Sequence, residues 1–156
     1  LDYAMAAVGL EDPRLRSRLM ELYFSLDAYP DAVDTLKALK AAERRTAILS
    51  NGSKSMLVSC VKHADIHALL DQIFSVDDVE IYKPHPKVYQ MAVDGLGLEP
   101  NKICFVSANA WDVSGAAHFG FRVVWVNRFG ARPEMTPGRA EHEIPSLAAL
   151  PPLLDL

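Results

Sequence analysis

An apolar run that passes directly into polar side chains constrains this chain more than any other feature. Residues 103–106 read Ile-Cys-Phe-Val, a pattern typical of a strand that is buried on both faces. Ser107 and Asn109 follow at once, and Asp112 lies in the first turns of a helix predicted over residues 111–119. Ligands of open parallel α/β sheets bind at the carboxyl ends of the strands. The stretch therefore indicates a candidate site.

A helix start explains the same residues without any site. Asn109 would then be the N-cap, and Asp112 would stand at the third helical position, which is close to a capping box. Capping residues are common wherever strands meet helices, so this stretch alone leaves both interpretations open. The rest of the chain has to decide between them.

The composition excludes several classes of function. The 156 residues are 50% hydrophobic and 23% charged, which is typical of one globular domain or of one domain with a fragment of another. The net charge of −4 comes without a basic stripe, so nucleic acid is not expected as a partner. No membrane span or signal peptide is predicted, and no membrane partner is expected. Cys60 and Cys104 lack a CxxC spacing, which favours free thiols in a reducing cytoplasm.

Helical and strand patterns alternate after residue 30. Residues 1–27 are predicted to be helical throughout, and Asp31 is a good N-cap for the next helix. Short apolar runs predict strands at residues 46–49, 73–76, 103–106 and 121–126, with helical segments between them. The end of the chain is predicted to be irregular, with a short helix around residues 147–150. This alternation predicts an α/β fold with a parallel, Rossmann-like sheet and flanking helices.

The turn after the first predicted strand is a second candidate site. Ser50-Asn51-Gly52-Ser53 leads into a helix, whose free backbone N–H groups and dipole attract anions. An ordinary βα loop explains this tetrapeptide as well, and such loops are ubiquitous in α/β folds. The tetrapeptide by itself therefore favours the plain loop.

A lysine in an extended loop is a third candidate. Lys83 lies in the segment Ile81–Pro86, from which it could reach back toward a site, although most lysines are solvated. Tyr89 lies within two turns of Lys83 and could share its direction. His63 and His67 have the i,i+4 spacing of zinc ligands, but no third ligand is evident, so no metal site is predicted.

These motifs, in this order, resemble the haloacid dehalogenase (HAD) superfamily. The resemblance rests on the Ser50-Asn51-Gly52 turn, Lys83-Pro84, and the strand that ends at Ser107 with Asp112 beyond it. Within that superfamily, the string from Phe105 to Ala116 closely resembles the (S)-2-haloacid dehalogenases. The nearby Phe119-Gly-Phe and Trp125-Val-Asn-Arg strings strengthen the match, which covers nearly the whole chain.

The resemblance implies a hydrolase of carbon–halide bonds that needs no cofactor. A family aspartate attacks the halogen-bearing carbon of a short (S)-2-haloalkanoic acid, and water then hydrolyses the aspartyl ester to the (R)-2-hydroxy acid. It also implies a homodimer and assigns roles to four groups of residues. Ser50 and Asn51 would bind the substrate carboxylate or the halide, and Lys83 would keep the nucleophile ionised. The remaining residues would orient the nucleophile and the water (Ser107, Asn109, Asp112) or pack around the site (Tyr89, Trp111).

The same positions argue against the metal-dependent phosphatases of the superfamily. Those enzymes hold magnesium with a second acidic residue about four positions before the last one, and Ala108 stands there in this chain. An alanine side chain offers no oxygen to a hard cation. A magnesium-dependent phosphatase and a non-catalytic α/β binding domain remain the two alternative interpretations.

The family nucleophile has no counterpart in residues 1–156. It ends the first strand of the family sheet, in an Asp-x-x-Gly-Thr type of turn, and nothing before Thr46 matches that turn. We therefore expect the nucleophile upstream of this chain. Residues 1–28 are interpreted as the C-terminal remnant of a helical cap, and residues 29–156 as a HAD-like core that lacks its first strand. That strand would lie between the strands at 46–50 and 103–106, so two strand edges should be unpaired.

Overall fold

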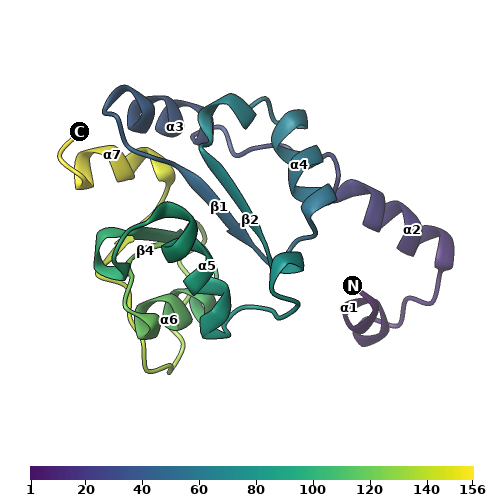
Figure 1. Cartoon of the computed structure of the whole chain (residues 1–156). Coiled ribbons are helices and arrows are strands. Elements are labelled where there is room, and N and C mark those ends of the chain that lie inside the picture. Colours follow the sequence, from purple (N-terminus) through teal and green to yellow (C-terminus); the bar gives the residue numbers. More distant parts are fainter.

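The structure confirms the α/β class. A computed structural model describes all residues from 1 to 156 (Figure 1). The helices are α1 (Asp2–Ala7), α2 (Pro13–Leu22), α3 (Ala32–Ala41), α4 (Lys54–His63), α5 (Pro86–Leu96), α6 (Ala110–Phe119) and α7 (Leu150–Leu153). The strands are β1 (Ala47–Ser50), β2 (Gln72–Ser75), β3 (Cys104–Ser107), β4 (Arg122–Val126) and β5 (His142–Ile144). Short 3₁₀ helices connect them, namely η1 (His67–Leu69), η2 (Val76–Asp78), η3 (Pro100–Lys102) and η4 (Leu147–Ala149).

The strands form two parallel sheets, with the break at the place where the sequence predicts a missing strand. β1 pairs with β2, from Ala47 opposite Gln72 to Ser50 opposite Ser75. The second sheet has the order β3-β4-β5, with Ser107 opposite Trp125. Figure 1 shows the β1–β2 pair lying apart from β4. No strand joins the two sheets, and β1 and β3 each keep one unpaired edge.

A largely apolar cavity of about 970 Å³ lies between these two strands. We call it the slot. Its walls include Ile48 and Leu49 of β1, and Phe105 and Val106 of β3. Free backbone N–H and C=O groups border the slot, because a strand edge pairs these groups only when a neighbour is present. The expected break between these two strands is therefore present in the structure.

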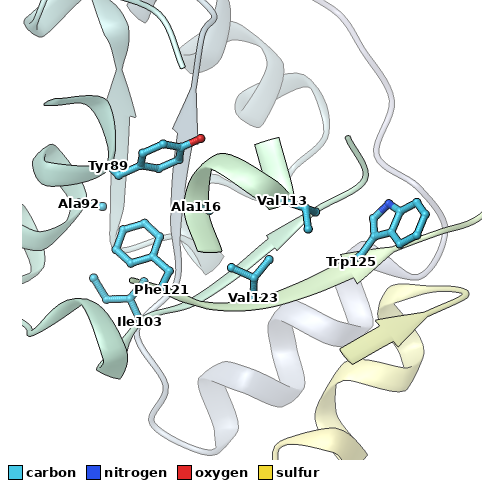
Figure 2. Close-up of a cluster of buried hydrophobic side chains, with 8 residues drawn as sticks. All are labelled: Tyr89, Ala92, Ile103, Val113, Ala116, Phe121, Val123 and Trp125. Carbon is cyan, nitrogen blue, oxygen red and sulfur yellow. The ribbon is translucent and has the colours of Figure 1, made fainter. Parts of the chain in front are cut away.

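Buried side chains on both faces of β4 hold the second sheet together. One cluster packs α5 and α6 against β3 and β4, and Figure 2 shows it (Tyr89, Ala92, Ile103, Val113, Ala116, Phe121, Val123, Trp125). The second cluster lies on the opposite face (Leu39, Val124, Val126, Ile144, Leu150). Val123 and Trp125 belong to the first cluster, whereas Val124 and Val126 belong to the second. This is the alternation that a strand buried on both faces requires.

The helical segment before residue 28 differs from its prediction. Residues 1–27 form two helices with a break between Val8 and Asp12, because Asp12 caps α2 by accepting from the Arg14 and Leu15 N–H groups. None of the α2 residues is buried. Figure 1 shows α1 and α2 lying away from both sheets. None of the helices is long and apolar enough to cross a membrane.

Two further local predictions are wrong. Asp31 stands before α3, but its side chain makes no capping bond, because its carboxylate binds the Arg128 guanidinium instead. Residues 142–144 were expected to be irregular and form the edge strand β5. Two of its three residues are exposed, so the sequence there lacks the apolar pattern that predicts a strand.

We expect residues 1–156, expressed alone, to self-associate and to bind the dye ANS. Both properties follow from the slot, which exposes apolar side chains and two unpaired strand edges. Sedimentation velocity and ANS fluorescence measure them. Ile48→Lys in the slot should lower dye binding, whereas Val58→Lys on the surface of α4 should not. A monomeric domain that does not increase ANS fluorescence would contradict the expectation.

Candidate active site

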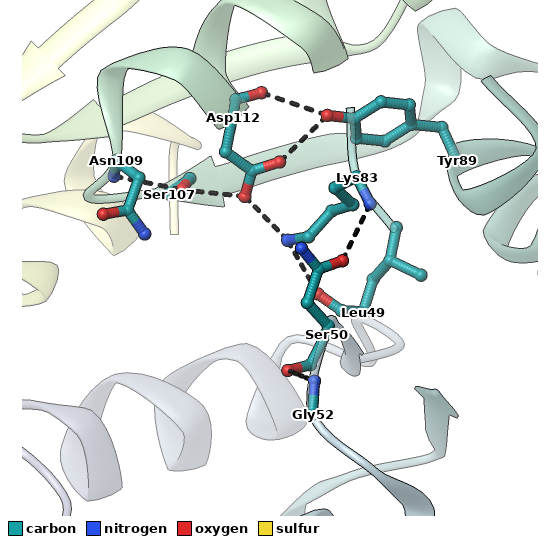
Figure 3. A network of polar contacts seen from close by, with 9 residues as sticks. Leu49, Ser50, Gly52, Lys83, Tyr89, Ser107, Asn109 and Asp112 are labelled. Atoms are coloured by element: carbon teal, nitrogen blue, oxygen red, sulfur yellow. Dashed lines mark hydrogen bonds and ion pairs between the residues drawn. The ribbon is translucent and has the colours of Figure 1, made fainter. Parts of the chain in front are cut away.

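The Asp112 carboxylate is the centre of a buried polar network (Figure 3). Asp112 is 2% exposed. One carboxylate oxygen accepts hydrogen bonds from Lys83 Nζ at 2.7 Å and from the Ser107 hydroxyl at 3.1 Å. The other accepts from the Tyr89 hydroxyl at 3.0 Å. Both oxygens of this carboxylate are therefore paired, as burial of a charge demands.

The helix-capping interpretation of this stretch is wrong. Asn109 is at the N-cap position of α6, but its side chain makes no capping bond, and its backbone N–H donates to Ser107 Oγ at 3.2 Å. The Asp112 carboxylate points toward Lys83, Tyr89 and Ser107 in Figure 3. The polar residues after β3 therefore form a site at the strand's carboxyl end.

Lys83 links the two sheets. Its ammonium group donates to Asp112 and to the Leu49 carbonyl oxygen of β1 at 3.1 Å, and it lies 5.4 Å from the centre of the Phe105 ring. The Lys83 side chain is 9% exposed, so the loop does carry it back into the site. An ammonium group has three N–H donors. Two are used in these contacts, which leaves one for a further acceptor.

The turn after β1 meets Lys83 directly. Asn51 Oδ1 accepts from the Lys83 backbone N–H at 2.8 Å, and Ser50 Oγ accepts from the Gly52 N–H at 3.0 Å. These bonds use acceptor oxygens of both side chains. The Ser50 hydroxyl proton and the Asn51 amide protons remain available to an anion.

The backbone amides at the start of α4 do not form the free anion site that the sequence suggests. The Lys54 N–H donates to the Asp77 carboxylate at 2.8 Å, and Ser53 Oγ accepts from the Met56 N–H. A carboxylate of the protein therefore already lies at this helix N-terminus. The anion-binding capacity of the turn rests on the side chains of Ser50 and Asn51.

An aromatic cluster packs against Tyr89 and fixes the position of its hydroxyl in the network. Tyr89 is fully buried, and its ring lies edge-on to Phe105 and Phe121, with centroids 5.9 Å and 5.8 Å away. Burial, and then the negative charge of Asp112, raise the pKa of Tyr89 far above its usual range. Tyr89 is therefore protonated at neutral pH, where its hydroxyl donates to Asp112.

Sequence reasoning overlooked three groups in this site. They are the Leu49 carbonyl, the Phe105 ring, and Gly115. A Cβ atom on Gly115 would lie 2.5 Å from the Tyr89 hydroxyl, so α6 approaches Tyr89 closely because this position has no side chain. A glycine inside an apolar helical pattern was the signal that could have revealed this contact.

Two predicted site residues contribute no side chain to the network. The Asn109 amide has no hydrogen-bond partner in the chain, and Trp111 is 40% exposed. Their contacts with a substrate remain predictions. No group of three or more His, Cys, Asp or Glu side chains is arranged to hold a metal ion, and Ala108 contributes no oxygen.

Comparison with known proteins identifies the family. The family model for haloacid dehalogenase-like hydrolases matches residues 10–120. The chain is 48% identical over 155 residues to (S)-2-haloacid dehalogenase 1 of Pseudomonas sp. (strain CBS-3), covering 99% of this chain and 68% of that protein. It is also 48% identical to (S)-2-haloacid dehalogenase 4A of Burkholderia cepacia, of which it covers 67%. The chain belongs to the (S)-2-haloacid dehalogenases.

Solved structures agree with this assignment. A dehalogenase crystallised as an intermediate complex has a TM-score of 0.90 and 47% identity, over 97% of this chain and 67% of that one. The L-2-haloacid dehalogenase of Xanthobacter autotrophicus with chloropropionic acid covalently bound has a TM-score of 0.89 and 32% identity, over 98% and 71%. A HAD phosphatase from Thermococcus onnurineus is more distant, with a TM-score of 0.77 and 29% identity, over 98% of this chain and 69% of that one. The chain spans about two thirds of the length of the relatives that it matches.

We expect Lys83→Met to lower the free energy of unfolding by about 3–5 kcal/mol, because it leaves a buried carboxylate without its counter-charge. The double variant Lys83→Met/Asp112→Asn should lose less than the sum of the two single changes, since no bare charge then remains. Urea denaturation measures all three. The control is Lys54→Met, which breaks an exposed pair with Asp78 and should change stability by less than about 1 kcal/mol. If the loss in the double variant equals the sum of the two single losses, Lys83 and Asp112 do not interact.

Proposed function

We propose that this chain carries most of the active site of a hydrolase that converts short (S)-2-haloalkanoic acids to (R)-2-hydroxyalkanoic acids. The Asp112 network beside the slot is the observation that carries the proposal. It contains an ammonium group with one free donor, together with several neutral donors. These groups lie at the carboxyl ends of β1 and β3, which border the slot. These groups suit a reaction that begins with a carboxylate and releases a halide.

The covalent nucleophile in this proposal is an aspartate outside residues 1–156. Asp112 is a poor nucleophile, because its oxygens already accept from Lys83, Tyr89 and Ser107. A strand that fills the slot would pair with β1 and β3 and would end beside Lys83. An aspartate at its carboxyl end would then receive the remaining Lys83 donor, which keeps the attacking carboxylate ionised.

The reaction then has two steps. A carboxylate oxygen of the nucleophile bonds to C2 of the substrate, and the C2–halogen bond breaks with inversion, so that the halide leaves with the bonding electron pair. Water then attacks the carbonyl carbon of the aspartyl ester, which releases the 2-hydroxy acid and restores the carboxylate. Water must lose a proton in this step, and a positioned base speeds that loss.

The donors and acceptors around the slot suggest the role of each residue. Ser50 and Asn51 have free protons for the substrate carboxylate or the halide. Ser107, Asn109 and Asp112 orient the nucleophile and place the hydrolytic water. Trp111, exposed at the start of α6, and the buried Tyr89 ring pack around the site.

We also propose that residues 1–28 belong to a helical cap, that residues 29–156 are the core domain, and that the enzyme is a cytoplasmic homodimer. Support for the cap is the near absence of buried side chains in α1 and α2, which leaves their apolar residues without partners. The same exposed side chains suit a subunit contact. Cys60 and Cys104 are both free, which fits a reducing compartment.

We expect dehalogenation to be unchanged after exhaustive chelation. The Asp112 oxygens already have hydrogen-bond donors, and Ala108 has no side-chain oxygen. This site therefore has few free oxygen ligands for magnesium. Chloride release from (S)-2-chloropropionate with and without EDTA measures the requirement. A strict need for magnesium, or phosphate release from small phosphoesters at similar efficiency, would favour a phosphatase.

We expect Lys83→Ala and Asp112→Asn each to lower kcat by at least about 100-fold, for different reasons. Without Lys83 the nucleophile loses its counter-charge, so no ester should form. Without the Asp112 carboxylate, hydrolysis of the ester should slow, so intact mass spectrometry should detect the ester. Lys54→Ala is the control, because Lys54 pairs with Asp78 on the surface. A near-normal rate for Lys83→Ala would refute its assigned role.

A further inference from the structure

A second ion pair, largely shielded from water, lies beyond the carboxyl end of β4. The Arg128 guanidinium donates two hydrogen bonds to Asp31, one to each carboxylate oxygen, both at 2.9 Å. Each of the two side chains is 15% exposed. The Leu147 backbone N–H donates a third bond to the same carboxylate at 2.7 Å. The Tyr29 ring completes the cluster, with its centre 4.0 Å from the guanidinium carbon. We call these four residues the Arg128 cluster.

The Arg128 cluster anchors the point where the chain enters the core from α1 and α2. Tyr29 and Asp31 directly precede α3. The same connecting segment touches α4 at two places, where the Cys60 thiol donates to the Tyr23 carbonyl and where His63 meets Asp27. Asp27 is 94% exposed, so that second contact is weak. The bidentate Asp31–Arg128 pair, which is largely shielded from water, is thus the stronger attachment of this segment.

The anchored point also borders the candidate active site. Ala32 and Thr35, in the first turn of α3, line the slot together with Lys83 and Asp112. Arg128 follows β4, which pairs along its length with β3, the strand that ends at Ser107. The Arg128 cluster therefore connects the strand next to the site with the segment that leads to the helices.

We propose that Arg128 is a positioning residue for dehalogenation, acting through Asp31 and Tyr29 to fix where the segment that leads to α1 and α2 leaves the core. This inference rests on the proposed function and on the assignment of residues 1–28 to a cap. Arginine suits the task because its planar fork matches both carboxylate oxygens while its face stacks on an aromatic ring. Lysine would keep the charge and lose both the fork and the stacking.

The experiment compares Arg128→Lys with a matched control in the full-length enzyme. Arg122→Lys is the control, because Arg122 lies at the other end of β4 in an exposed pair with Glu141. Tyr29→Ala removes the stacked ring, and Tyr29→Phe keeps it. Chloride release from (S)-2-chloropropionate gives kcat and KM, at a temperature below the lowest unfolding midpoint of the set.

Arg128→Lys and Tyr29→Ala should raise KM by about tenfold and leave kcat within about threefold, because misplaced helices weaken binding without touching the reacting atoms. Arg122→Lys and Tyr29→Phe should behave as the wild type does. Hydrogen exchange without substrate should show faster exchange at residues 23–30 in Arg128→Lys and not in Arg122→Lys.

Two results would overturn the inference while leaving the proposed function intact. One is an active wild type in which Arg128→Lys and Tyr29→Ala lower the unfolding midpoint without changing KM, since the cluster would then be structural. The other is unchanged exchange at residues 23–30 in Arg128→Lys. A wild type that releases no chloride would instead overturn the proposed function itself, and with it this role of Arg128.

Discussion

The buried Asp112 carboxylate is the constraint on which the rest of this structure depends. A charge that has lost its water must be compensated by donors at fixed places. Here they come from three parts of the chain, namely the loop before α5 (Lys83), α5 itself (Tyr89) and β3 (Ser107). α6 carries Asp112 and must approach Tyr89 closely, which Gly115 permits. The polar network and the aromatic packing thus specify one arrangement of the same elements.

Several polar contacts join the two sheets across an apolar gap. Lys83 bonds to the Leu49 carbonyl, and its backbone N–H bonds to Asn51. Away from the site, Arg45 and Gln72 donate to carbonyl groups at the end of α5. The walls of the slot, in contrast, are mostly apolar side chains without a partner strand. Such a gap suits a strand that brings both backbone hydrogen bonds and apolar side chains.

The site also separates charged groups from neutral ones in a way that suits its proposed chemistry. The charges of Lys83 and Asp112 compensate each other, so the pair contributes little net charge to the slot. Ser50, Asn51 and Asn109 contribute neutral donors with protons to spare. Neutral donors bind a carboxylate or a halide without the strong attraction for phosphate that a cluster of arginines would create. These donors therefore suit the proposed haloacid substrate.

The sequence by itself determined the family and the α/β class, and it predicted four residues that the structure brings together, Lys83, Tyr89, Ser107 and Asp112. The positions of β1 to β4 could be predicted to within about a residue, because buried strands are short apolar runs that end in turn residues, whereas the mostly exposed β5 was missed. Only the tertiary structure decided that Asp112 binds Lys83 instead of capping its helix, and that Asp31 pairs with Arg128, which is 97 residues away in the chain. A capping residue and a buried ion-pair partner have the same side chain. Local sequence cannot distinguish them, because the difference lies in what a distant segment brings to the carboxylate.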